Sequence, residues 1–161
     1  MLIISLNGAG ALDARLGDFP AALLGDIAAK AAVLADALRD KVKYDKLSGQ
    51  VLHAVSGALR DSIFAEVGDQ GDGVLASVGS AGDIKYAAIQ EYGGKTAAHE
   101  ILPAKAGALA FMAGGALHFA RRVEHPGSLI PERSYVRSSL AEMTDEIVAT
   151  LAGTVDETWG R

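Results

Sequence analysis

The residues best suited to acid–base catalysis or metal binding are four histidines: His53, His99, His118 and His125. No two of them are three or four positions apart, so a helical turn does not place a pair on one face. His99 and His125 each adjoin a glutamate, but adjacent side chains along a chain point in different directions. The histidines form no local signature of a hydrolytic or metal site, and a site assembled from distant residues stays open.

Two glycine-rich segments share features with nucleotide-binding loops. Residues 7–10 (NGAG) follow an apolar run, but the third small residue of the dinucleotide fingerprint is replaced by Asp13, a carboxylate where pyrophosphate would lie. Residues 94–96 (GKT) match the end of a P-loop, yet the place of its first glycine is occupied by Ile89. Residues 97–103 do not predict the helix that should follow. Neither segment predicts a nucleotide site, and we expect no cofactor.

Composition narrows the class of protein further. The chain has 161 residues and a mass of 16.6 kDa, which fits one domain. Its hydrophobic content of 50% includes thirty alanines, and only 6% of the residues are aromatic. Because alanine buries little area, we expect a thin core that relies on a partner or on self-association. The lack of cysteine excludes disulfides, thiolate metal sites and cysteine catalysis.

The charge balance argues against a general nucleic-acid binder, because 15 basic and 20 acidic residues give a net charge of −5. Residues 1–83 and 142–161 each carry a net charge of −4, whereas residues 84–141 carry +3. This distribution fits either an ordinary solvated surface or a basic face that docks on an acidic face of a neighbouring subunit. The candidate interface residues in the basic segment are Lys95, Arg121, Arg122 and Arg137.

The first ten residues carry no basic region, and their apolar run is too short for a signal peptide. No stretch of 18 apolar residues occurs, so we expect no membrane span. The simplest compartment is a reducing cytosol, or a particle assembled there.

Apolar residues spaced by three and four positions predict two long helices. One covers about residues 19–44, with Phe19-Pro20 as a start signal, and the other covers 132–157. Two shorter helices are predicted, one from residue 51 to Gly57 or Leu59 and one over residues 84–92, the second ended by glycine. The apolar stripe of the last helix consists of Val136, Leu140, Met143, Ile147, Leu151 and Val155.

If this stripe is buried in the monomer, Leu140→Ala should lower the free energy of unfolding by roughly 2–5 kcal/mol. If it is buried only in an assembly, the stability of the monomer should not change.

Alternating apolar and polar residues predict two hairpins. A polar tip over residues 68–73 joins the first pair of strands, and Gly114-Gly115 joins the second. Residues 2–6 (LIISL) predict a further strand, followed by a loop to residue 17. Residues 101–103 should be extended, because proline disfavours helix at the residue before it. The predicted strands, in pairs, are 63–67 with 74–78 and 109–112 with 116–120.

These elements together predict an α+β fold with a mostly antiparallel sheet built from hairpins, packed against a long N-terminal helix and a C-terminal helix. We expect residues 1–18 to form an N-terminal strand or arm, and residues 19–161 to form one domain. The N-terminal segment and the tip over 68–73 are candidates to reach neighbouring subunits and to become ordered on assembly.

Four motifs, in a fixed order along the chain, are unusual in combination. Residues 55–63 read VSGALRDSI, 86–93 read YAAIQEYG, 101–105 read ILPAK and 131–137 read PERSYVR. In this order and spacing the chain resembles the neck or tail-completion proteins of tailed bacteriophages, and it is similar to the lambda-type minor tail protein Z. The resemblance covers about residues 25–155.

The resemblance implies that the motif residues hold a fold and that the protein has no catalytic site, no metal and no cofactor. Ser134 departs from the family, which often has a second proline there. A helical ion pair between Glu91 and Lys95 is expected if that short helix extends to Lys95. The residues that match the family motifs are Gly57, Leu59, Ser62, Ile63, Tyr86, Glu91, Gly93, Ile101, Pro103, Lys105, Pro131, Arg133 and Tyr135.

In functional terms the resemblance implies a virion structural protein at the head–tail junction. Such proteins form a homo-oligomeric ring, here expected to contain about six copies, closed by heterologous contacts. Its partners would be head-closure or stopper proteins and tail-terminator or tail-tube proteins. Genome DNA would pass through the lumen without sequence-specific binding, and a net-negative lining would let it slide.

Other functions stay open from the sequence. A tail terminator that caps the tail tube is one alternative within virion assembly. A small cytosolic enzyme and a DNA-binding module that uses the basic segment belong to other classes. A saturable small-molecule ligand would favour the enzyme, and steep salt-dependent duplex binding would favour the DNA-binding module.

Overall fold

The computed structural model describes residues 9–49, 51–52, 56–71, 73–82, 84–104 and 107–160. Its fold is α+β, as predicted, with a long N-terminal helix, a long C-terminal helix and antiparallel strand pairs between them. The helical elements are α1 (Ala9–Lys41), the π-helical segment η1 (Val42–Lys46), α2 (Ala58–Asp61), α3 (Ala87–Tyr92) and α4 (Tyr135–Trp159). The strands are β1 (Ile63–Asp69), β2 (Val74–Ser80), β3 (Gly94–Lys95), β4 (His99–Ile101), β5 (Leu109–Ala113), β6 (Ala116–Ala120), β7 (Val123–His125) and β8 (Leu129–Ile130).

The described residues group into two compact units. The first unit contains the residues up to Ala87 together with those from Ser134 onward, and the second unit contains Ala88–Arg133. The sequence predicts one domain from residue 19 onward, whereas contacts divide the chain within that range. The division follows from the strand pairing, because β3 to β8 pair only with one another in the described chain.

The long N-terminal helix starts earlier than the sequence predicts. It begins at Ala9, so Pro20 lies inside it and not at its first turn. Three alanines and two leucines among residues 9–17 favour helix, and α1 extends past the proline toward the N-terminus despite Gly10 and Gly17. The predicted loop is therefore wrong from residue 9 onward, and the predicted strand over 2–6 lies outside the described residues.

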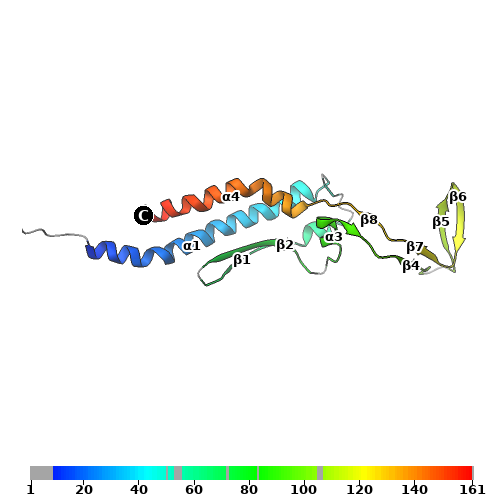
Figure 1. Cartoon of the computed structure of the whole chain (residues 1–161), viewed down its shortest axis with the longest axis horizontal. Coiled ribbons are helices and arrows are strands. Elements are labelled where there is room, and N and C mark those ends of the chain that lie inside the picture. Colours follow the sequence, from blue (N-terminus) through cyan, green and yellow to red (C-terminus); the bar gives the residue numbers. More distant parts are fainter. Residues whose placement is uncertain are drawn as a thin grey trace, which may run out of the picture. The chain divides into compact units, whose positions relative to one another are not determined.

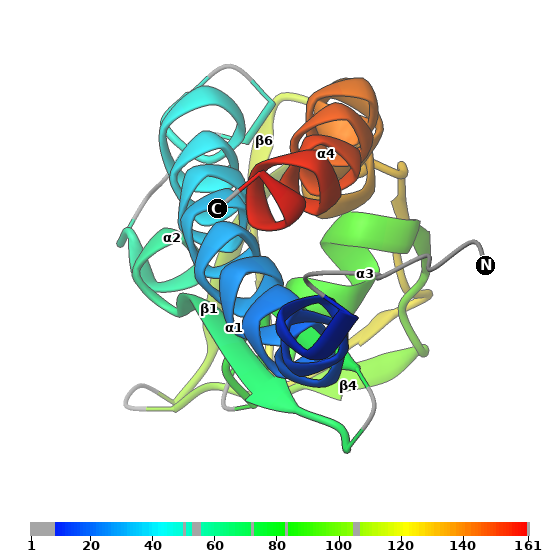
Figure 2. The same cartoon turned by 90° about the vertical axis from the view of Figure 1, so that its left-hand side faces the viewer.

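Aromatic and cationic side chains hold the two helices of the first unit together near the end of α4. Trp159 packs edge-on against Phe19 of α1, with ring centroids 5.2 Å apart, and the Arg15 guanidinium lies over the indole at 5.1 Å. Figures 1 and 2 show α1 and α4 side by side and antiparallel, with the β1–β2 hairpin along another side of α1. α1 therefore supplies the surface on which both neighbours pack.

The last helix begins at Tyr135, three positions after its predicted start at residue 132. Its N-cap residue, Ser134, has a left-handed backbone with φ of 40°. The preceding residue, Arg133, donates its backbone N–H to the carbonyl of Gln90 at 3.1 Å, which holds residue 133 outside the helix. Only part of the predicted stripe is buried: Met143 is 7% exposed, whereas Leu140 is 46% exposed.

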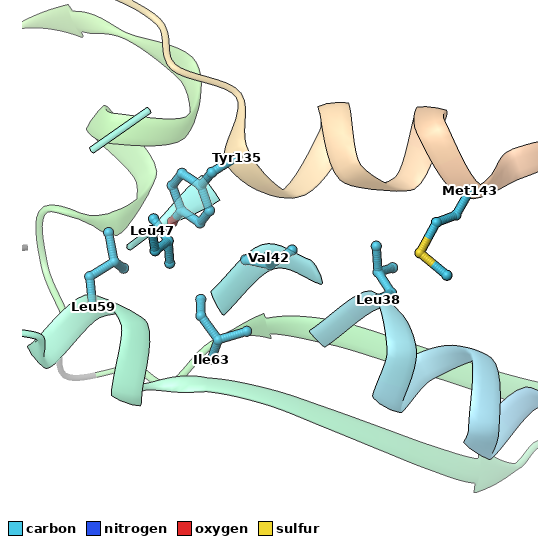
Figure 3. Packing of buried hydrophobic residues seen from close by; sticks show 7 residues of the cluster. All are labelled: Leu38, Val42, Leu47, Leu59, Ile63, Tyr135 and Met143. Atoms are coloured by element: carbon cyan, nitrogen blue, oxygen red, sulfur yellow. The ribbon is translucent and has the colours of Figure 1, made fainter. Parts of the chain in front are cut away.

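The core of the first unit is a cluster of aliphatic side chains around one tyrosine (Figure 3). Val42, in η1, is fully buried and Leu47 is 2% exposed, so the end of α1 lies at the centre of the cluster. Figure 3 shows Leu38 directed toward Met143 across the contact between α1 and α4. The buried members are Leu38, Val42, Leu47, Leu59, Ile63, Tyr135 and Met143.

A cluster of ion pairs joins α4 to the end of α1 and to η1, beside the core. Glu142 of α4 accepts from Lys46 at 2.5 Å and lies 2.9 Å from the Lys41 ammonium. These hydrogen bonds, the one to Lys46 foremost, lower the pKa of the Glu142 carboxyl below its ordinary value. The bonds to Glu142 and then Asp45 raise the pKa of Lys41. The cluster therefore connects α4 to η1 through Lys46 and to the end of α1 through Lys41.

The helix predicted from residue 51 to Gly57 or Leu59 is wrong over residues 51–52 and 56–57, whereas residues 58–59 are helical as the start of α2. Residues 51–52 form a bend, 53–55 lie outside the described residues, and α2 is a single turn over Ala58–Asp61. Gly57 precedes it with φ of 75°, a left-handed conformation that favours glycine and interrupts a continuous helix.

The first predicted hairpin is confirmed and slightly longer than expected. β1 and β2 pair in antiparallel register from Ile63↔Ser80 to Asp69↔Val74. Burial alternates along β1, with Ile63 inside and Phe64 exposed, as a half-buried strand requires. In this two-stranded sheet both strands are edges.

The second unit consists of three antiparallel strand pairs and most of α3. The second predicted hairpin, β5–β6, is confirmed, and both residues of its turn have positive φ, 59° at Gly114 and 82° at Gly115. The predicted short helix over 84–92 forms only from Ala87 onward and ends before Gly93, whose φ is 68°. The pairs are β3–β8, β4–β7 and β5–β6.

Candidate subunit interface

The first motif of the phage resemblance lies in the core framework of the first unit. Leu59 and Ile63 are 8% and 2% exposed and belong to the core cluster. The Ser62 hydroxyl donates to the Leu59 carbonyl at 2.7 Å and lies 2.8 Å from the Ser80 hydroxyl. Gly57 provides the left-handed turn before α2. These positions give the motif a structural role, consistent with the resemblance.

Tyr135, from the last motif, is also part of this framework. Its ring is 2% exposed, and its hydroxyl donates to the carbonyl of Ala87 at 3.2 Å. Tyr86, from the second motif, is 44% exposed on the turn before α3. The two tyrosines that match the family motifs therefore differ: Tyr135 is anchored in the core and Tyr86 faces solvent.

In the second unit, motif residues hold α3 to the segment that precedes α4. Arg133 donates its backbone N–H to the backbone carbonyl of Gln90. Its guanidinium donates to the side-chain amide oxygen of Gln90 at 2.7 Å. At Gly93, an added Cβ would lie 2.7 Å from the backbone nitrogen of Glu132, so no larger residue fits. Pro131 is exposed beside them.

The remaining motif residues do not gather into a site. Glu91 is 5% exposed on α3, which ends at Tyr92, so the helical pair expected with Lys95 does not form on one helix. Ile101 is 36% exposed at the end of β4, and Pro103 is half-buried beyond it. Lys105 lies outside the described residues.

The four predicted interface cations are exposed, three of them in the second unit and one in the first. Lys95 is on β3, Arg121 follows β6, and Arg137 is in the first turn of α4. The Arg122 guanidinium lies 3.2 Å from Glu100 and 3.8 Å from Glu124 of its own chain. Arg122 is therefore partly neutralised within the second unit.

A pair of histidines in the second unit is absent from the sequence prediction. His99 of β4 and His125 of β7 are directly opposite in the antiparallel register, and their rings stack with centroids 5.0 Å apart. A pocket of about 300 Å³ beside them also contacts Glu100, Arg122 and Glu124. The sequence carries one signal of this pairing, the mirrored order of HEI in one strand and VEH in the other. That signal identifies the histidine pair only when the strand register is known.

This pair does not make a metal centre. The Nδ1 atom of His125 accepts the backbone N–H of Gly127 at 3.0 Å, which removes one of its two ring nitrogens as a ligand. Over the described ranges, no group of three or more His, Asp or Glu side chains is arranged to hold a metal ion. The two imidazoles therefore lack the further ligands that a tetrahedral site requires.

An apolar concavity of about 410 Å³ lies in the first unit and is here called the apolar groove. It exists because α4 and the β1–β2 hairpin both pack on α1 and leave a channel between them. Three consecutive residues of β2 line it, so the strand borders it by an edge, since alternate side chains point to opposite faces. The lining residues are Ala31, Leu34, Ala35, Leu38, Ala76, Ser77, Val78, Val136, Leu140, Ile147 and Leu151.

The β5–β6 hairpin of the second unit presents an exposed apolar face. In its register Met112 is opposite Leu117, and Phe119 is opposite Ala110 on the same face. Met112 is 66%, Leu117 57% and Phe119 69% exposed. No charged residue occurs between Leu109 and Ala120. We call Ala110, Met112, Leu117 and Phe119 the hairpin face.

No protein-family model, curated protein or solved structure matches this chain. Within the part of the chain that the structure describes, no helix combines the length and apolar character needed to cross a bilayer. The geometry of the two units is therefore the basis for the functional argument.

Proposed function

We propose that this chain is a structural subunit of a tailed-bacteriophage virion, located at the head–tail junction, where copies form a ring that joins head and tail. The observation that carries the proposal is the pair of large apolar surfaces, the apolar groove and the hairpin face. Contiguous exposed apolar patches on a soluble protein are often sites of protein–protein contact. A ring subunit would have both surfaces covered by its neighbours.

The resemblance to phage neck proteins is the reason for proposing the head–tail junction as the location of this assembly. Two motifs contribute Leu59, Ile63 and Tyr135 to the core of the first unit, and Gly93 and Arg133 connect α3 to the chain before α4. Motifs that serve a framework fit a structural protein better than an enzyme. In this proposal the ring contains about six copies, and genome DNA passes through a lumen that does not bind it specifically.

A gene deletion in the phage that encodes this chain tests the proposal. We expect full heads and tails of normal length that do not join, and we expect the purified protein to restore joining when it is added to both. Tails of abnormal length would instead support a terminator, because loss of a cap leaves tube growth unchecked. Normal infectious particles after the deletion would refute a virion role.

A further inference from the structure

We infer that copies of this protein associate head to tail, with the hairpin face of one copy seated in the apolar groove of the next. The inference deepens the proposed function, on which it rests for closure of the ring. It commits to a second copy of the chain as the occupant of the groove.

The two surfaces match in length and in chemistry. On α4 the groove extends from Val136 to Leu151, about 22 Å at the helical rise of 1.5 Å per residue. A five-residue strand such as β5 or β6 is about 17 Å long. The groove is lined by alanine and branched aliphatic side chains, and the hairpin face contains no charge to desolvate.

Unpaired strand edges reinforce the match. β2 pairs with β1 alone in the described chain, and its other edge borders the groove. The β5–β6 ladder is likewise two-stranded, and Figure 1 shows no other strand of the second unit beside it. An isolated two-stranded hairpin is marginally stable in water. A hairpin lying in the groove would place one of its strands along β2, where the unpaired backbone groups of both can bond.

The area available explains why the contact favours a closed ring. Met112, Leu117 and Phe119 together expose on the order of 350 Å² of side chain, so a contact made through the hairpin face alone is small. A specific two-protein interface usually buries about 1,200–2,000 Å². One such contact is small for a stable dimer, whereas a ring gives every copy two contacts and is stabilised by closure. A contact between different surfaces of two copies is the heterologous type that a ring needs.

The chain offers a clean cross-linking test because it has no cysteine. Leu117→Cys places a thiol on the hairpin face, and Leu140→Cys places one in the groove, where the side chain is 46% exposed. We expect an oxidised mixture of the two variants to form a disulfide-linked dimer that contains one copy of each. The matched control replaces Leu140→Cys with Val33→Cys, a 69% exposed position of α1 that does not line the groove, and should give no such dimer.

Association measurements provide the second arm. Phe119→Asp should raise the protein concentration needed for half-association about tenfold or more, with an unchanged circular dichroism spectrum, because the substituted side chain is exposed in the monomer. Val33→Asp is the control and should leave association unchanged.

The possible results separate the contact from the ring. If the wild-type protein forms rings and neither the cross-link nor the effect of Phe119→Asp is found, the head-to-tail contact is overturned while the ring stands. A chain that carries both cysteines and closes an internal disulfide at high dilution would overturn it as well. A wild-type protein that stays monomeric at all concentrations would refute the ring together with the contact.

Discussion

Two substitutions on neighbouring turns of α4 should separate stability of the monomer from stability of the assembly. Met143 is 7% exposed and belongs to the core, so Met143→Ala should lower the free energy of unfolding by about 2–5 kcal/mol. Leu140 is 46% exposed, so roughly half of its burial is realised in the monomer. Full burial of a leucine is worth about 1.5–3 kcal/mol, so Leu140→Ala should cost about 1 kcal/mol in the dilute protein.

The assay is urea unfolding of both variants at two protein concentrations. In the dilute sample the Met143→Ala midpoint should be clearly lower than that of Leu140→Ala. At a concentration where the wild type associates, Leu140→Ala should lose additional stability relative to the wild type, because binding that favours the folded state raises apparent stability. Met143→Ala should show the same loss at both concentrations.

One result would refute this reasoning directly. If Leu140→Ala destabilises the dilute protein as much as Met143→Ala does, then Leu140 is fully packed in the monomer and the apolar groove is closed. A loss below about 1 kcal/mol for Met143→Ala would instead contradict its place in the core.

Three further predictions concern other parts of the chain. Gly127→Ala should lower the stability of the second unit, measured by hydrogen exchange, by at least about 2 kcal/mol. Its φ is 85°, and an added Cβ would clash with the backbone oxygen of Thr96. Gly115→Ala meets open space and should cost about 1 kcal/mol. The pKa of Glu142 is lower in the folded protein than its ordinary value of about 4.3, so the ionised carboxylate stabilises the fold at pH values above that. This stabilisation is lost as the pH falls through the folded pKa. The unfolding temperature of Glu142→Gln should therefore fall less steeply than that of the wild type between about pH 5 and pH 3. Arg121→Glu should leave the unfolding midpoint unchanged and reduce head–tail joining in extracts, and normal joining would remove this cation from the interface.

Local signals predicted the hairpins and failed at the start of α1. Strand alternation and Gly114-Gly115 specify β1–β2 and β5–β6 through neighbouring residues alone. At the N-terminus, the start signal at Phe19-Pro20 competes with the helix propensity of the preceding alanines and leucines. Propensity prevails, aided by the contacts of Trp159 with Arg15 and Phe19, which are distant in sequence.

The candidate surfaces depend on pairings that no single segment encodes. The stacked imidazoles of His99 and His125 follow from the β4–β7 register, and the apolar groove follows from α4 and β2 sharing α1. Partial burial of the stripe on α4 has the same cause, since Leu140 faces the groove and Met143 faces the core. The periodicity of the sequence identifies an apolar helix face but not how much of it the monomer covers.

The division into units also changes the meaning of the overall charge of −5. The first unit contains ten basic and sixteen acidic residues, a net charge of −6, and the second contains five basic and four acidic residues, a net charge of +1. A head-to-tail contact puts the second unit of one copy against the first unit of the next, so unlike charges meet around the proposed ring. Contacts between like units would bring two first units together and repel. The apolar surfaces would then supply most of the affinity, while charge selects the orientation in which they meet.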